Sequence, residues 1–257
     1  MKCIQEKLNE IKNGEVGVIV FSDLKEEIIL SSNEDLLVPL ASAAKVGIGY
    51  CIAKFIEEGE FKWTDLVDQI SFNPKEDSKE IYPHLQSRDF LYLQEAVEVM
   101  IACHDSFIAN RVVHYCGGWE KINQKIQSSF IHMNFTEDSR DRQNVGKLSE
   151  LMVLIQLIFQ GYKHNHKVWA PIVNGLVRQR GDIEGIPSHH LNHMTGGLSN
   201  AVIDVGILGG FSKHPYLYVL VANKLPNRFN DDLADKKIME MMVLLYEKNQ
   251  REVGELN

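Results

Sequence analysis

The sequence lacks several features that mark particular classes of protein. Its four cysteines show no C-x-x-C spacing, so we expect reduced, mostly buried thiols rather than a disulfide framework. No apolar run approaches the length of a membrane-spanning helix, and the charged stretch from Met1 to Glu10 does not resemble a secretory signal. We therefore expect a cytoplasmic protein with no membrane partner, unless a leader has been removed.

Basic residues are too few and too scattered to form a nucleic-acid surface. The chain has 27 Lys and Arg against 35 Asp and Glu, a net charge of −8, and no local basic cluster that would override it. No repeat, low-complexity tract or Pro/Ser-rich linker divides its 257 residues. Hydrophobic residues make up 44%, enough for a sizeable core, so the composition fits a soluble enzyme or binding protein.

Strand and helix patterns separate along the chain. Apolar strand patterns lie near both ends, each set with a terminal helix outside it, whereas helical periodicity dominates from Ser42 to about Gln179. The economical arrangement is one antiparallel sheet built from both chain ends, with the helical block as an insertion. The elements expected are a helix to residue 12, strands at 16–21 and 27–30, helices at 43–58, 94–104, 108–116 and 147–160, strands at 201–208 and 216–222, and a helix at 231–248.

These elements predict a mixed α/β (α+β) fold. Because no linker separates the two kinds of pattern, we expect a single interleaved unit over residues 1–257. Its α/β part would comprise residues 1–41 and 186–257, and its helical part residues 42–185.

Ser42 and Lys45 form the first candidate site. The segment Ser42-Ala43-Ala44-Lys45 is predicted to open a helix, which places the serine hydroxyl and the lysine ammonium on one face. A desolvated lysine can lose its proton near neutral pH and activate a serine, and N–H groups at a helix start can stabilise an oxyanion. The alternative is that Ser42 only caps the helix.

A second polar segment, His104-Asp105-Ser106, interrupts two apolar helical patterns. A short loop there could aim polar side chains into a cleft. The same residues also suit a structural role, in which Asp105 or Ser106 caps the second helix and His104 ends the first.

The third segment is His193-Met194-Thr195-Gly196-Gly197, which precedes a predicted strand. Its glycines allow the backbone to approach a ligand closely, although a tight turn into an edge strand explains the same residues without one. The nearby His189 and His190 have no carboxylate or cysteine at a standard metal-ligand spacing, so we expect no metal site.

Taken in order, the three segments resemble the S-x-x-K, S-D-N and K-T-G boxes of class A β-lactamases and penicillin-binding proteins. The resemblance spans essentially the whole chain. It implies a β-lactamase/transpeptidase-like fold, in which terminal helices flank a five-stranded antiparallel sheet and an all-helical region is inserted. The flanking residues that resemble the family are Val38-Pro39-Leu40-Ala41, Asp105 to Asn110, Ile186-Pro187 and Asn200 to Gly206.

The resemblance also implies roles for individual residues. Ser42 would be acylated, Lys45 would activate it, and the main-chain N–H groups of Ser42 and Gly197 would form the oxyanion hole. His104 stands where the family has a serine that relays a proton to the leaving nitrogen, a step that imidazole can perform. The other expected site residues are Ser106, Thr195 and Gly196 in substrate binding, with Thr195 holding a substrate carboxylate, and Asp105 and Asn110 in support of the site.

Three further departures from the family pattern bear on substrate recognition and on deacylation. Ser106 replaces an asparagine that binds an acylamino side chain, and Met194 replaces a lysine that attracts a carboxylate, so we expect weakened recognition of ordinary penicillins. The segment 130–144 lacks the E-x-x-L-N sequence that supplies a water-activating glutamate in class A β-lactamases, although Arg140-Asp141 resembles the pair that closes that loop. We therefore do not expect efficient deacylation by the usual route.

The function expected is that of a serine hydrolase that forms an acyl-enzyme with a small-molecule amide, lactam or ester, without a cofactor. One alternative is a catalytically degenerate binding protein of the same fold. Another is a D-alanyl peptidase-like enzyme, which in the cytoplasm would act on wall precursors or recycled fragments. The sequence specifies neither the natural substrate nor the oligomeric state.

Overall fold

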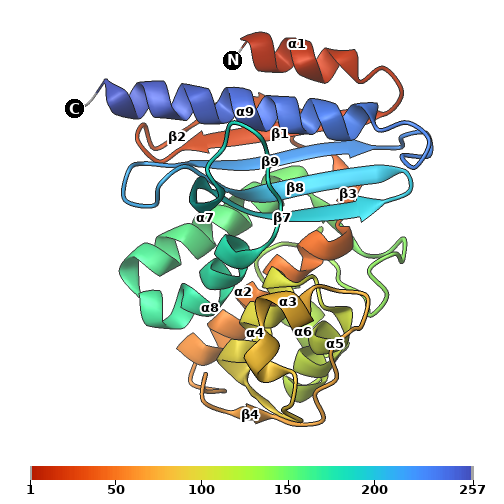
Figure 1. Cartoon of the computed structure of the whole chain (residues 1–257), viewed down its shortest axis with the longest axis vertical. Coiled ribbons are helices and arrows are strands. Elements are labelled where there is room, and N and C mark those ends of the chain that lie inside the picture. The colour runs from red at the N-terminus through yellow and green to blue at the C-terminus, as the bar shows by residue number, and fades with distance from the viewer. Residues whose placement is uncertain (1, 256–257) are drawn as a thin grey trace. The chain divides into compact units, whose positions relative to one another are not determined.

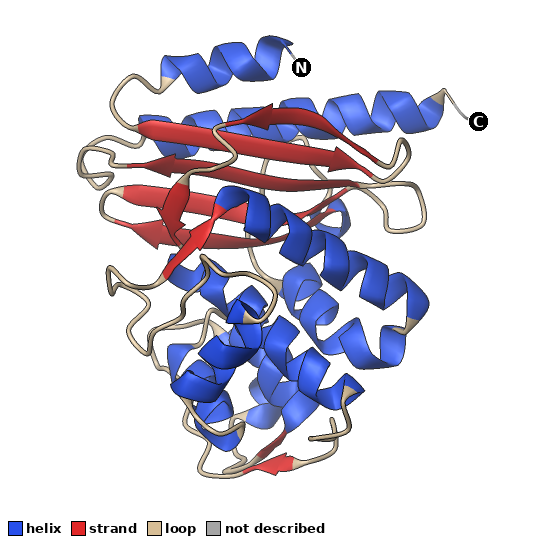
Figure 2. Cartoon of the chain, turned by 180° about the vertical axis from the view of Figure 1, so that it is seen from behind, coloured by secondary structure: helices blue, strands red, loops and turns tan. Residues whose placement is uncertain are grey.

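The computed structural model describes residues 2–255, which divide into two compact units. Among these residues, unit 1 comprises residues 2–43, 145–155 and 181–255, and unit 2 comprises residues 44–144 and 156–180. Unit 1 holds the main sheet and unit 2 is largely helical (Figure 1, Figure 2). Within residues 2–255, no helix combines the length and the apolar character that a membrane crossing requires.

Unit 1 is built on a five-stranded antiparallel sheet, as predicted, with the strand order β2-β1-β9-β8-β7. Segments from the two ends of the chain meet inside it, because β1 pairs with β9 from Glu15 opposite Asn223 to Ser22 opposite Tyr216. Every residue of β8 and β9 is buried, which explains their nearly continuous apolar sequences. The strands are β1 (Glu15–Ser22), β2 (Glu27–Ser32), β7 (Leu191–Leu198), β8 (Ala201–Leu208) and β9 (Tyr216–Asn223).

Two helices, α1 (Lys2–Glu10) and α9 (Leu233–Gly254), lie side by side along one face of this sheet (Figure 1). Their apolar residues, such as Leu8 and Met241, share one hydrophobic core with strand residues such as Tyr218. Lys7 of α1 also forms a 2.8 Å ion pair with Glu240 of α9. The predicted terminal helices therefore flank the sheet.

Strand β7 differs from the sequence-based expectation. The segment His193–Gly197 was expected to precede a strand, but it lies inside β7, which pairs with β8 along its whole length. Two glycines and the polar His193 and Thr195 obscure the strand pattern in the sequence. The hydrogen bonds that β8 offers outweigh this low local propensity.

The remaining elements of unit 1 include the segment that leads to Ser42. A short ribbon joins β3 (Leu37–Pro39) to β6 (Val145–Lys147), and β3 leads into the 3-10 turn η1 (Ala41–Ala43). The helix α7 (Leu148–His164) starts in this unit, and a second 3-10 turn, η3 (Ser188–His190), comes just before β7.

Unit 2 is formed by helices that follow the predicted apolar periodicity. Its core elements α2, α4 and α8 pack closely, and a Cβ atom at Gly175 of α8 would lie only 2.6 Å from the Ile101 Cβ atom of α4. The elements are α2 (Ala44–Glu57), α3 (Ser78–Ile81), η2 (Pro83–Leu85), α4 (Leu93–Ala102), α5 (Ser106–Tyr115), α6 (Trp119–Gln127), the end of α7, α8 (His166–Arg178) and a ribbon of β4 (Leu66–Val67) with β5 (Leu91–Tyr92).

Candidate active site

Ser42 lies in the turn η1, which leads directly into helix α2. The Ala43 N–H group donates to the Leu40 carbonyl oxygen at 2.9 Å and closes the turn. Ala41 and Ala43 are buried on either side, whereas Ser42 is only half-buried. Ala41 also adopts a left-handed φ of 46°, a conformation that costs a non-glycine residue about 1 kcal/mol and is enriched at functional sites.

Strand β7 runs against the chain just before Ser42. A Cβ atom at Gly196 would lie 2.5 Å from the Leu40 carbonyl oxygen and 3.2 Å from the Ala41 Cβ atom, so only glycine permits this approach. Gly197 follows and is exposed. Because β7 is an edge strand, alternate main-chain N–H groups point away from the sheet. Unit 1 thus places the two expected oxyanion-hole residues, Ser42 and Gly197, on neighbouring segments.

Lys45 lies in the first turn of α2, three residues after Ser42, and only 4% of it is exposed. Burial removes the ammonium from water and lowers the pKa of Lys45 to about 8, although the nearby carboxylates of Glu76 and Asp105 act in the opposite direction. A lysine with this pKa is partly neutral near physiological pH. It can therefore act as a general base.

The second box connects α4 to α5. Asp105 is fully buried and caps α5, because its Oδ1 atom accepts the N–H groups of Phe107 at 2.9 Å and Ile108 at 3.0 Å. His104, just before it, is half-buried and has a left-handed φ of 53°. A left-handed backbone at a non-glycine residue is uncommon and is enriched at functional sites.

Asn73 is a neighbour of this box that the sequence analysis missed. Its main-chain N–H group donates to Asp105 Oδ2 at 2.9 Å, and its side-chain amide donates to Ser106 Oγ at 3.2 Å. A carboxamide therefore lies against the residue that replaces the family's asparagine. No motif signals this, because Asn73 comes from a polar loop 33 residues earlier in the chain.

Asn110 lies one turn further along α5 and faces the segment that lacks E-x-x-L-N. Its side-chain amide donates to Glu137 Oε1 at 3.5 Å, and Glu137 is exposed. The loop after Glu137 is shaped by local turns, in which Asp138 accepts the Arg140 N–H group at 2.9 Å and Asp141 accepts the Gln143 N–H group at 2.8 Å. Glu137 was also not identified from the sequence.

The third box is less polar than its family counterpart. Met194 is fully buried, so no cation occupies this position of β7. Thr195 is half-buried, and its hydroxyl donates to Asp204 Oδ2 at 2.5 Å. Arg228, a third residue not identified from the sequence, lies beside Gly197, where its terminal Nη1 atom is 3.1 Å from the position of a Cβ atom. An ion pair with Asp235 compensates its charge.

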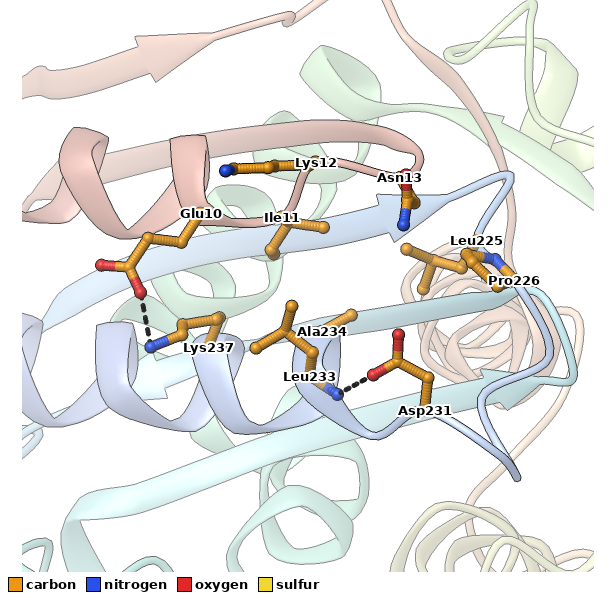
Figure 3. Close-up of a pocket in the computed structure, with 10 residues that line it drawn as sticks. All are labelled: Glu10, Ile11, Lys12, Asn13, Leu225, Pro226, Asp231, Leu233, Ala234 and Lys237. Atoms are coloured by element: carbon orange, nitrogen blue, oxygen red, sulfur yellow. Dashed lines mark hydrogen bonds and ion pairs between the residues drawn. The ribbon is translucent and has the colours of Figure 1, made fainter.

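A separate pocket in unit 1 contains none of the predicted site residues. It lies between the end of α1 and the start of α9, and its lining Glu10 and Lys237 form an ion pair of 2.6 Å (Figure 3). The lining includes no serine, histidine or cysteine that could act as a nucleophile. Within residues 2–255, no three histidine, cysteine or acidic residues are placed to hold a metal ion.

Comparisons with known proteins identify the family of the chain. The model of the family described as "Beta-lactamase enzyme family" matches residues 2–248, nearly the entire chain. The chain belongs to the β-lactamase enzyme family. This family is made up of hydrolases of the penicillin-binding fold, which typically act through a serine acyl-enzyme. No curated protein sequence matches the chain.

Solved structures with the β-lactamase fold resemble the chain over nearly its full length. A point mutant of PBP-A, in an acyl-enzyme complex with penicillin G, has a TM-score of 0.79 at 19% identity and covers 97% of this chain and 96% of its own. A β-lactamase from Chitinophaga pinensis has a TM-score of 0.78 at 15% identity, with coverages of 96% and 98%. An ancestral class A β-lactamase has a TM-score of 0.75 at 16% identity, again with coverages of 96% and 98%. At these identities the likeness concerns the fold.

Proposed function

We propose that this β-lactamase family member is an acyl-transferring serine hydrolase acting on a small amide, lactam or ester. The observation that carries the proposal is Lys45, a nearly fully buried lysine with a pKa lowered to about 8, placed three residues after Ser42 where η1 runs into α2. A lysine is seldom buried to this extent, since desolvation of its charge is costly.

Lys45 takes the proton from the Ser42 hydroxyl, and Ser42 Oγ attacks the substrate carbonyl carbon. The negative charge that develops on the carbonyl oxygen is stabilised by the main-chain N–H groups of Ser42 and Gly197. As the carbonyl re-forms, the C–N or C–O bond breaks, and His104 relays the proton held by Lys45 to the leaving nitrogen or oxygen. Ser106, with the neighbouring Asn73 amide, and Thr195 with Gly196 contact the substrate, while Asp105 and Asn110 support the second box.

The nucleophile is tested by intact-mass spectrometry after incubation with a fluorescent penicillin, nitrocefin and an activated ester. We expect a covalent adduct with at least one of them, and Ser42→Ala should remove it because Ser42 is the nucleophile that the proposed mechanism acylates. An adduct that survives Ser42→Ala would contradict the assignment. No adduct and no hydrolysis would instead favour a binding protein that keeps the fold without turnover.

Glu137 is our candidate for activating the water that releases the acyl group. It is a carboxylate of the segment 130–144, it accepts a hydrogen bond from Asn110 at the second box, and it is exposed to water. We expect Glu137→Gln to leave acylation nearly unchanged and to lengthen the lifetime of the Ser42 adduct by about 10²-fold or more, as for loss of a general base.

Asp138→Asn is the matched control, because the adjacent Asp138 lies in a turn rather than against Asn110. The measurement is the decay of adduct mass with time after removal of excess reagent. Equal adduct lifetimes in Glu137→Gln and the wild-type protein would show that the water is activated elsewhere.

A non-catalytic binding protein remains the second candidate. It is favoured by the third box, where Met194 is buried and supplies no cation for a substrate carboxylate. A D-alanyl peptidase-like activity would differ from both by releasing free D-alanine from peptides that end in D-alanyl-D-alanine, which an assay for the free amino acid detects.

A further inference from the structure

A buried polar network lies behind Thr195 in the sheet. Asp204 of β8 is directly opposite Thr195 of β7 in the strand register, and it is 3% exposed. The same carboxylate accepts from the Tyr218 hydroxyl of β9 at 2.7 Å and from His193 Nδ1 at 3.0 Å. Asp204 is the lone charged residue of a strand that is otherwise entirely apolar apart from a glycine.

The register explains how the imidazole reaches this carboxylate. Gly206 is the partner of His193 across the β7–β8 ladder, and a Cβ atom there would lie 2.7 Å from the His193 Cα atom. The missing side chain leaves room for the ring to turn toward Asp204. Nδ1 must carry the hydrogen, because a carboxylate can only accept. The His193 Nε2 atom is buried without a partner, so the ring has one hydrogen-bonding function in the described structure, to hold Asp204.

Asp204 in turn sets the direction of the Thr195 hydroxyl. A threonine hydroxyl has one hydrogen to donate, and here it is given to Asp204 Oδ2 at 2.5 Å. A hydrogen bond to a buried carboxylate is stronger than one to a neutral group, so the hydroxyl is not expected to turn away. Toward a ligand, Thr195 therefore offers only its oxygen lone pairs.

Arg228, the cation beside Gly197, is largely occupied by partners within the protein. Arg228 donates through Nη1 to the carbonyl oxygens of Leu198 at 2.8 Å and Ala201 at 2.7 Å, and its other nitrogens pair with Asp235. Four of the five N–H bonds of the guanidinium are thus engaged within the protein. Met194 contributes no charge.

We infer that Thr195 acts as a hydrogen-bond acceptor for the substrate, and that the substrate carries a donor at this position, such as a carboxamide, hydroxyl or ammonium group, instead of a carboxylate. A carboxylate would face the lone pairs of Thr195 with no hydrogen between them. The inference rests on the proposed acylation of Ser42, and it reverses the polarity that the family resemblance implies for Thr195.

Two thioesters that differ in one group test this. N-phenylacetylglycyl thioesters of mercaptoacetic acid and of mercaptoacetamide share the acyl part and place a carboxylate or a carboxamide on the leaving thiol. Ser42 attacks the thioester carbonyl, the C–S bond breaks and the thiol takes up a proton, so thiol release and adduct mass both report acylation. We expect the amide to be favoured in kcat/KM by about ten-fold or more, because the carboxamide gains one hydrogen bond to Thr195 that the carboxylate cannot make.

Asp204→Asn should shift the preference toward the acid by about ten-fold. The Tyr218 hydroxyl still needs an acceptor, so the asparagine oxygen stays on that side and its NH2 group faces Thr195, whose hydrogen is then released toward the ligand. Tyr218→Phe is the matched control, since it removes another donor to Asp204 and should keep the preference for the amide. Thr195→Val is a second variant, which should abolish the preference even if Asp204→Asn does not fold.

The outcomes separate this inference from the proposed function. A wild-type protein that favours the acid, or treats both thioesters alike, would overturn the inference while leaving Ser42 as nucleophile. An amide preference that survives both Asp204→Asn and Thr195→Val would also overturn it, because another group would then set the polarity. Absence of any Ser42 adduct with either thioester would overturn the proposed function and the inference together.

Discussion

Replacing Lys45 by methionine should lower the rate of Ser42 acylation by about 10³-fold and at the same time stabilise the protein. The activity falls because methionine has no lone pair with which to accept the serine proton, and loss of a general base typically costs two to four orders of magnitude. In the wild-type protein, acylation should rise with pH and level off above about pH 8, where Lys45 is neutral. The measurement is the pH profile of adduct formation.

The stability gained by Lys45→Met should fall as pH rises, whereas acylation by the wild-type protein should increase. A lysine pKa lowered from 10.5 to about 8 means that the folded protein disfavours the ammonium by about 3 kcal/mol, an order-of-magnitude value that already includes the attraction of Glu76 and Asp105. Below pH 8, both the folded and the unfolded lysine are protonated and the full cost is present. Between pH 8 and 10.5 only the unfolded lysine keeps its proton, so the advantage of Lys45→Met should shrink as pH rises.

Lys54→Met on the same helix is the control. Lys54 is partly exposed and forms an ion pair with Glu57 at 2.6 Å, so its replacement should change neither acylation nor stability by much. Denaturant unfolding at pH 7 and pH 10 measures the free energies. If Lys45→Met were less stable than the wild-type protein at pH 7, the lysine would be a structural cation rather than a base held at a cost.

Gly196→Ala should lower acylation by about 10²-fold without removing any reactive group. The new Cβ atom would lie 2.5 Å from the Leu40 carbonyl oxygen and 2.8 Å from Ile203, so the main chain before Ser42 must move. A displacement of about 1 Å at a nucleophile is enough for a loss of this size. Acylation is measured with the reagent that labels Ser42 in the wild-type protein.

Gly197→Ala, one residue later, is the matched control. A Cβ atom there would meet only the tip of the Arg228 side chain, at 3.1 Å, and the main-chain N–H group of the proposed oxyanion hole is retained. Its loss of acylation should be about ten-fold smaller than that of Gly196→Ala. Similar losses in the two variants would mean that close packing against Leu40 does not position Ser42.

The fold was largely predictable because apolar periodicity reports burial. Strand β8 was predicted with both of its limits correct, and β9 differs by one residue, because each is an apolar run bounded by polar or turn residues. Strand β7 was not predicted, because its glycines and polar residues pack against the Leu40 turn and Asp204 instead of filling the core. Its strand character comes from pairing with β8, which periodicity does not report.

The residues of the three boxes could be proposed from the sequence because each box is a continuous motif. The residues that contact the boxes from other parts of the chain could not be proposed in this way. Asn73 and Glu137 reach α5 from loops, and loop conformation is not encoded in any periodic pattern. Asp204 could have been found, because a single carboxylate within an apolar strand is a buried charge that requires partners. The direction of the Thr195 hydroxyl needed the structure itself.

The central pairing of β1 with β9 has a consequence for synthesis of the protein. β1 ends at Ser22, but its partner begins only at Tyr216, so nearly the whole chain must leave the ribosome before the sheet can close. At about 5–20 residues per second, β1 and β2 wait roughly 10–40 s with an unpaired strand edge open to aggregation or chaperone binding. We therefore expect slower synthesis of the last third of the chain to reduce the yield of folded protein without changing its stability.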